Sequence, residues 1–206
     1  AAGCFLIRDA HMDGSKITFL EQLDIPGGSL DGAVRQNLGY VARGGREMGH
    51  HFEVLWSLFS SLPSTEDPNM SVLDHFYYTN YDDPNFSNCR ITKNQGVRYD
   101  NGKFNLGQDL AKELAAFTAM KDEDLQNKTI EDIFSDELLI SDFWAYWRTM
   151  FAFENWHSAL EMKLYMTRFI HHVGGLTNLS ALQFSRHDQY TSFVKPMVKY
   201  MLIFLL

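Results

Sequence analysis

The sequence predicts an α/β protein in which helices predominate. Residues 1–11 have the pattern of an amphipathic helix, and residues 16–20 are typical of a strand that ends at Glu21. A helix, a short loop, a strand and an acidic residue, in that order, form the second half of a dinucleotide-binding βαβ unit. From residue 50 onward the apolar residues recur at helical spacing. We therefore expect an incomplete Rossmann-like segment with a helical insertion and a small β-hairpin.

Three regions follow from this pattern. Residues 1–49 are expected to form the partial Rossmann-like segment, with its first strand and Gly-rich turn missing before residue 1. Residues 50–180 are expected to be a mostly helical insertion on the substrate side. Residues 181–206 are expected to return to the first region, and the apolar run 201–206 suggests that this return is truncated. The sequence therefore looks like a fragment of a longer protein or the product of an incomplete gene model.

Single residues mark several boundaries in the helical region. One predicted helix stops at Pro63, and Ser71 can cap the next one. Another amphipathic helix is expected at 107–120, followed by a charged connector that we expect to face solvent. Residues 90–92 and 97–99 are expected to pair as a hairpin.

Later boundaries follow the same rules. Thr129 and Asp132 are spaced as an N-cap pair before a short helix. Residues 189–206 are expected to be helical with Phe193, Met197 and Tyr200 inward, and Pro196 is expected to bend this helix or shift its start.

Two further segments leave a choice between core and function. Residues 141–153 are dense in aromatic side chains, which indicates a buried core, although an apolar channel for an acyl chain would use the same residues. In the predicted helix 156–173, one face carries Glu161, Tyr165, Arg168 and His172. That face is either a polar surface with i,i+4 pairs or places a tyrosine where it can deliver a proton in a cavity.

Composition excludes several classes of function. The chain has 206 residues and a net charge of −8 with no basic block, so nucleic-acid binding through phosphates is disfavoured. Cys4 and Cys89 suit neither a metal site nor a disulfide framework, which favours a reduced, cytoplasmic protein. Neighbouring histidines point in different directions on a helix, and no metal site is expected. No apolar run reaches the ~20 residues of a membrane-spanning helix.

The segment 39–48 is the strongest candidate for a site. It contains Arg43, Gly44, Gly45, Arg46 and Glu47 in sequence. Adjacent glycines permit positive φ and close approach of a ligand, and two guanidiniums suit an anionic group such as a phosphate. The alternative is a surface turn whose arginine and glutamate side chains pair in solvent.

This segment does not stand alone. It follows Pro26-Gly27-Gly28-Ser29-Leu30-Asp31-Gly32 and precedes five further motifs. They are Asp82-Asp83-Pro84-Asn85, Ser87-Asn88-Cys89-Arg90, Phe143-Trp144-Ala145-Tyr146-Trp147, Met150-Phe151-Ala152-Phe153-Glu154 and Trp156-His157-Ser158-Ala159. In this order, the set resembles the oleate hydratase family, flavoproteins once called myosin-cross-reactive antigens. The resemblance covers almost the whole chain, and only residues 201–206 depart from it.

The resemblance implies FAD as cofactor. It makes Glu21 a contact to the adenosine part of FAD, whereas its position alone fits an ordinary acid at a strand end. Gly27, Gly28 and Ser29 would meet the cofactor through backbone and hydroxyl groups, or form no more than a turn. Arg43, Gly44, Gly45 and Glu47 complete the implied cofactor-binding set.

The implied reaction is the addition of water to the cis double bond of an unsaturated fatty acid such as oleate, giving a 10-hydroxy fatty acid. By resemblance, Glu47 activates water and Tyr165 donates the proton, while FAD acts through structure and charge rather than hydride transfer. The alternatives are an FAD-dependent fatty-acid isomerase or other redox flavoenzyme, and a non-catalytic fragment. Full-length relatives are expected to be homodimers, and contact with a membrane surface is left open. The isolated chain is expected to be inactive and to bind FAD weakly or not at all.

Overall fold

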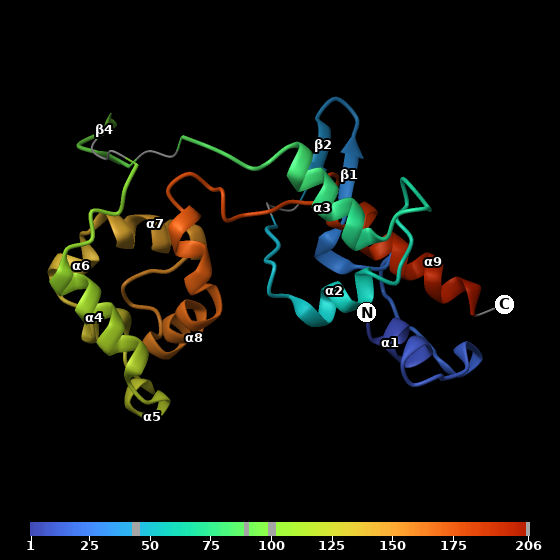
Figure 1. Ribbon diagram of the computed structural model, residues 1–206, viewed down its shortest axis with the longest axis horizontal. Coiled ribbons are helices and arrows are strands. Elements are labelled where there is room, and N and C mark those ends of the chain that lie inside the picture. Colours follow the sequence, from blue (N-terminus) through green and yellow to red (C-terminus); the bar gives the residue numbers. More distant parts are fainter. Residues whose placement is uncertain (43–45, 89–90, 99–101, 205–206) are drawn as a thin grey trace. The chain divides into compact units, whose positions relative to one another are not determined.

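The computed structural model describes residues 1–42, 46–88, 91–98 and 102–204, and it divides into two compact units (Figure 1). Unit 1 comprises Ala1–Pro84 and Gln183–Leu206, and unit 2 comprises Asn85–Leu182. Unit 2 is therefore inserted in the sequence of unit 1. About half of the chain is helical, and the strands of the described residues form two separate two-stranded hairpins.

Unit 1 combines helices from both ends of its sequence. Its elements are the helices α1 (Ala2–Arg8), α2 (Glu53–Phe59), α3 (Val72–Asp82) and α9 (Lys195–Ile203), short 3₁₀ turns at Gly14–Lys16 and Gly28–Leu30, the hairpin β1 (Gly32–Arg35) and β2 (Gly39–Ala42), and a π-type turn at Tyr190–Val194. Helices α1 and α9 pack side by side, and the Cys4 thiol lies 3.7 Å from the Met197 carbonyl (Figure 1).

The core of unit 1 joins α1, α2, α3 and the turn before α9. Trp56 of α2 and Phe76 of α3 pack with ring centroids 4.7 Å apart, and Phe59 stacks on Phe193 at 4.9 Å. Such aromatic contacts bury large apolar areas and hold elements that are distant in the sequence. Phe193 is thus inward as the sequence predicts, and α9 begins at Lys195 with Pro196 in its first turn, where proline is tolerated.

Helix α3 begins where the sequence predicts. The Ser71 hydroxyl accepts a hydrogen bond from the backbone N–H of Asp74, and the Asp74 carboxylate accepts one from the Ser71 backbone N–H. This reciprocal capping box satisfies two N–H groups that the first helical turn leaves without partners. Helix α2 ends before Pro63, also as predicted.

The expected strand at 16–20 is wrong. Residues 14–16 form a 3₁₀ turn, and Ile17 is extended but belongs to no strand. Phe19 and Leu20 are exposed, and no strand pairs with this segment in the described parts of the chain. An extended segment becomes a strand only when another strand satisfies its backbone groups, so the local pattern was insufficient.

Unit 2 is built from helices around one core. It contains β3 (Thr92–Lys93), β4 (Val97–Arg98), α4 (Gln108–Ala119), α5 (Asp122–Leu125), a 3₁₀ turn at Ile130–Asp132, α6 (Asp136–Leu139), α7 (Asp142–Phe151), α8 (Ala159–Phe169) and a 3₁₀ turn at Ile170–Gly175. The predicted helix at 107–120 is confirmed as α4. The predicted hairpin is confirmed over its described residues, and Asp132 accepts the Thr129 backbone N–H as expected.

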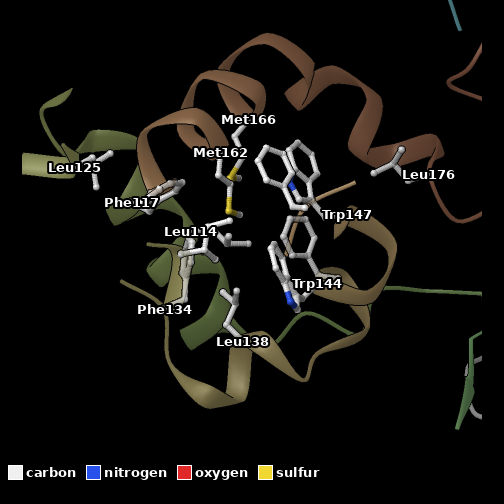
Figure 2. Packing of buried hydrophobic residues seen from close by; sticks show 14 residues of the cluster. Leu114, Phe117, Leu125, Phe134, Leu138, Trp144, Trp147, Met162, Met166 and Leu176 are labelled. Atoms are coloured by element: carbon white, nitrogen blue, oxygen red, sulfur yellow. The ribbon is translucent and has the colours of Figure 1, made fainter. Parts of the chain in front are cut away.

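The aromatic segment 141–153 supplies the centre of this core. Trp144 and Trp147 of α7 are almost fully buried and face Met162 and Met166 of α8 across the core (Figure 2). The connector 121–128 is not simply a solvent-facing segment. Leu125 is fully buried, and the Lys163 ammonium donates to the Asp122 carboxylate at 2.6 Å.

Candidate functional site

A cavity of about 580 Å³ lies in unit 1, between the segment that follows the Gly27–Gly28 turn and the segment that precedes α9. Its volume is in the range of small-molecule sites. Most of its lining side chains are polar or charged; the lining consists of Ser29, Leu30, Asp31, Tyr40, Arg46, Phe184, Ser185, Arg186, His187, Asp188, Gln189 and Thr191.

The turn at Gly27 and Gly28 positions Ser29 at this cavity. Both glycines have positive φ, 109° for Gly27 and 57° for Gly28, which side chains rarely allow. A Cβ atom at Gly27 would also press on the Val194 side chain at 3.2 Å. The two glycines are therefore required by the backbone conformation of this turn, which carries the chain to Ser29.

Arg46 links the segment 39–48, to which it belongs, to the turn at residues 27–29. Its guanidinium donates to both the carbonyl and the hydroxyl of Ser29, each at 3.2 Å. Its carbonyl accepts from the Gln189 side chain at 3.4 Å. Two residues later, the Met48 backbone N–H donates to the Gln183 carbonyl. The structure thus brings together residues 27–29, residue 46 and the segment after 183.

Tyr40 of β2 ties the hairpin to the far wall of the cavity. Its hydroxyl donates to the Asp188 carboxylate, which raises the pKa of Tyr40, with burial and the negative charge of Asp188 adding to the effect. The phenol lies diagonally across Gly32, and a Cβ atom at that position would collide with it. Gly32 is therefore the residue that leaves room for this contact.

Asp188 also caps the helical segment that follows it. Its two carboxylate oxygens accept from the Thr191 hydroxyl at 2.7 Å and the Thr191 backbone N–H at 3.1 Å. Burial acts to raise the pKa of Asp188, but the hydrogen bonds from Tyr40 and Thr191 outweigh it and hold the pKa below its ordinary value. Asp188 is therefore a fixed negative charge in the cavity wall.

The remaining predicted residues of unit 1 are placed differently. The Glu21 carboxylate accepts from the backbone N–H groups of Gln22 and Leu23, so it stabilises its own turn and does not follow a strand. Glu47 is exposed and adjoins the cavity residue Arg46. The predictions for Arg43, Gly44 and Gly45 fall outside the described residues.

Tyr165 lies in unit 2, on α8, with 37% of its surface exposed. Its ring packs edge-on against Phe151 and Phe153, with centroids 5.9 and 5.2 Å away, and is tilted against Phe169 at 5.7 Å. The ring is therefore held by aromatic neighbours on one side while part of it remains accessible. The helix expected at 156–173 is shorter in the structure, because α8 ends at Phe169 and His172 lies in the 3₁₀ turn that follows, where it is buried.

Unit 2 has its own cavity of about 520 Å³ beside α7. Tyr146, Thr149 and Met150 contribute to it from α7, and Leu176 and Leu179 from the segment after α8. The aromatic segment thus contributes to both a core and a cavity wall. Tyr165 is not among the lining residues, so this cavity does not contain the predicted proton donor.

Several residues of the unit 1 cavity have no counterpart in the predictions. Tyr40 lies in the candidate segment 39–48 but was given no role, and Asp188 gave no motif, because their partnership joins positions far apart in the chain. The only local signal was the polar run from Ser185 to Gln189, in which Asp188 precedes Thr191 at the spacing of a helix cap.

Among the described residues, no group of three histidine, cysteine, aspartate or glutamate side chains is placed to hold a metal ion. Within the same residues, no helix has the length and apolar character needed to cross a membrane.

Comparison with known proteins gives matches along nearly the entire chain. The chain is 50% identical to oleate hydratase of Streptococcus pyogenes serotype M49 (strain NZ131), over 98% of this chain and 34% of that protein. It is 28% identical to linoleate hydratase of Lactiplantibacillus plantarum, over 98% of this chain and 39% of that protein. The chain thus spans between a third and two fifths of the length of these relatives. Since the model of the MCRA family matches residues 1–202, the protein belongs to the MCRA family.

Proposed function

We propose that the full-length protein is a fatty-acid double-bond hydratase that adds water to the cis double bond of a substrate such as oleate, giving a 10-hydroxy fatty acid. The observation that carries this proposal is the 50% identity to an oleate hydratase across 98% of the chain. The second relative is also named for hydration of an unsaturated fatty acid, linoleate, which supports the same type of reaction.

FAD is the proposed cofactor, held in a Rossmann-like domain of which residues 1–49 are part. The residues around the unit 1 cavity fit such a group. The turn at Gly27 and Gly28 leads into the cavity wall at Ser29, and Ser29 and Arg46 contribute a hydroxyl and a guanidinium to its lining. These groups suit the hydroxyl and phosphate groups of a dinucleotide. When bound, FAD would supply order to the loop around residues 43–47 and charge near the reacting alkene.

Tyr165 and Glu47 are the proposed acid and base. The Tyr165 phenol would transfer its proton to one alkene carbon, and the Glu47 carboxylate would take a proton from water as its oxygen bonds to the other carbon. One C–H and one C–O bond form, the π bond breaks, and the proton on Glu47 returns to Tyr165 through solvent. The exposure of both side chains supports these roles, since each can meet another molecule.

The proposal is tested in the full-length protein with Glu47→Gln and Tyr165→Phe. Each change removes one proton transfer, so the rate of 10-hydroxy acid formation should fall by roughly 10²–10⁴-fold. Glu137→Gln, an exposed change on α6 of the same unit, is the matched control and should keep the activity of the wild type. Undiminished hydration by Glu47→Gln would remove this carboxylate from the mechanism.

Product analysis with linoleate separates this proposal from its alternative. A hydratase yields a hydroxy acid, whereas a flavin-dependent isomerase yields a conjugated diene, which absorbs in the ultraviolet. Formation of the diene without the hydroxy acid would contradict the proposed reaction.

A further inference from the structure

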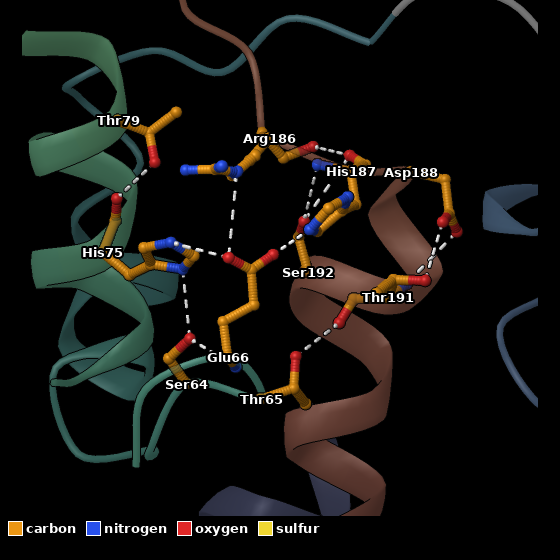
Figure 3. A network of polar contacts seen from close by, with 11 residues as sticks. Ser64, Thr65, Glu66, His75, Thr79, Arg186, His187, Asp188, Thr191 and Ser192 are labelled. Carbon is orange, nitrogen blue, oxygen red and sulfur yellow. Dashed lines mark hydrogen bonds and ion pairs between the residues drawn. The ribbon is translucent and has the colours of Figure 1, made fainter. Parts of the chain in front are cut away.

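A network centred on Glu66 lies directly behind the wall of the unit 1 cavity. Figure 3 shows the Glu66 carboxylate between the rings of His75 and His187, with the Arg186 guanidinium nearby. One carboxylate oxygen lies 3.3 Å from His75 Nε2 and 3.8 Å from Arg186 Nε, and the other contacts His187 Nε2. Arg186 and His187 line the cavity, but Glu66 does not.

Both histidines direct Nε2 at the Glu66 carboxylate, whose oxygens accept hydrogen bonds when it is ionised. Ser64 then completes the chain, because its hydroxyl lies 3.0 Å from His75 Nδ1 and accepts the Glu66 backbone N–H at 3.2 Å. Each polar group in this chain thus has a partner of the right kind, as expected of a preorganised network.

The Asn80 side chain binds the backbone of the same cavity wall. The Asn80 amide of α3 donates to the Phe184 carbonyl at 2.9 Å and accepts the Phe184 N–H at 3.2 Å. These two bonds replace the partners that a neighbouring strand would supply. The extended segment before α9 is therefore fixed at Phe184 by Asn80, and at Arg186 and His187 by Glu66.

We propose that Glu66 is a positioning residue of this cavity: it holds Arg186 and His187 in the wall, so that these two side chains are preorganised to contact a ligand. Glu66 is 33% and His75 18% exposed, so their contact is partly shielded from water, whereas Arg186 and His187 are 58% and 44% exposed and remain accessible to a ligand. A preformed wall spares the ligand the cost of ordering these side chains on binding. The identity of the ligand as FAD rests on the proposed function.

Nuclear magnetic resonance of the side chains tests the inference in the whole chain without any ligand. In the wild type, the Nε2–H signals of both histidines should show hydrogen bonding, and the Arg186 Nε–H signal should report the carboxylate 3.8 Å away. Glu66→Ala should move all three to the positions of solvent-exposed groups, and Glu66→Gln, which keeps one acceptor without the charge, should have an intermediate effect. Glu53→Gln is the matched control, because Glu53 is 72% exposed and contacts His51 on the surface.

FAD added to millimolar concentration provides the second readout. The Arg186 and His187 signals should shift in the wild type, and the apparent Kd should rise about tenfold in Glu66→Ala. Circular dichroism confirms that each variant is folded, and Glu66→Gln serves if Glu66→Ala is not. Unchanged His187 and Arg186 signals, or unchanged affinity, in a folded Glu66→Ala chain would overturn the inference. If FAD shifts no signal in the wild type, the cofactor proposal fails for this chain, and the ligand-free spectra decide the role of Glu66.

Discussion

Asp188 combines a capping role with a contact to a distant strand. It accepts hydrogen bonds from Thr191 in the turn that follows it and from Tyr40 of the hairpin. Because its pKa is held below the ordinary value, the folded state favours the ionised form more than the unfolded chain does. Asp188 therefore contributes stability above its unfolded pKa of about 3.9, and this contribution is lost as the pH falls through the lower folded pKa.

The lowered pKa of Asp188 gives a prediction for the variant Asp188→Asn. The variant should be less stable than the wild type at pH 6, and the difference in free energy of unfolding should shrink as the pH falls from 5 to 3. Urea unfolding at several pH values measures it. Asp109→Asn is the control, because Asp109 is 95% exposed and pairs only with a nearby lysine on α4. A difference between wild type and Asp188→Asn that stays constant across this range would contradict the assignment.

At the same scale, residues with a local cause were predictable and residues with distant partners were not. The glycines at 27 and 28 and the cap at Ser71 act on the backbone within a few positions, so the sequence carries their signal. Glu66 and His187 are 121 positions apart, and no pattern in one segment reveals the other. The prediction that Glu21 ends a strand was wrong, since the strand expected before it does not form.

Helix α7 ends at a residue whose conformation is costly. Ala152 adopts φ 56° and ψ 40°, the left-handed region in which a Cβ atom is disfavoured. This turn directs the buried Phe153 back to the core, where its ring also packs against Tyr165. The end of α7 thus contributes to the placement of the proposed proton donor.

Two glycine substitutions in this element should have opposite effects. Ala152→Gly relieves the left-handed strain and should raise the free energy of unfolding by up to about 1 kcal/mol. Ala145→Gly, in the interior of the same helix, should lower it by about 1 kcal/mol because glycine is a poor helix former. Chemical denaturation of both variants measures the difference. A loss of stability in Ala152→Gly similar to that in Ala145→Gly would show that the strain is not significant.

Helices were the elements that the sequence predicted best. Their hydrogen bonds are internal, so spacing and caps within one segment suffice, as for α3 and α4. The helix expected at 156–173 was placed correctly but predicted too long, since α8 spans Ala159–Phe169. Strands depend on a partner, which explains the failure at 16–20. It also explains why the hairpin of β1 and β2 is hard to anticipate, since only Asn37 and Gly39, both with positive φ, mark its turn.

At the scale of the molecule, each unit has a separate hydrophobic core. In unit 2 the core includes Trp144, Trp147, Leu138, Met162 and Met166, all at most 2% exposed. A self-contained core of this kind is what allows a domain to fold alone. The cavity and the Glu66 network belong to unit 1 alone, and they combine residues from both parts of its sequence.

We expect residues 85–182 to fold when produced alone. The isolated unit should show a near-ultraviolet circular dichroism signal from its buried tryptophans and a cooperative urea transition. Leu138→Ala should lower its free energy of unfolding by roughly 2–5 kcal/mol, since Leu138 is fully buried. Ser180→Ala, at an exposed position outside the helices, should leave the transition unchanged. A gradual transition without the near-ultraviolet signal would show that the unit depends on the rest of the chain.

Because unit 1 is discontinuous in sequence, its two parts are synthesised at different times. Translation supplies Ser29, Tyr40 and Arg46 early, but it supplies Arg186, His187 and Asp188 only after the whole inserted unit has emerged. During synthesis, the N-terminal residues of the cavity therefore lack their C-terminal partners while the helices of unit 2 fold. Until then, the early half displays apolar side chains such as Trp56 and Phe59 without Phe193, which makes this interval the period when a chaperone would be most useful.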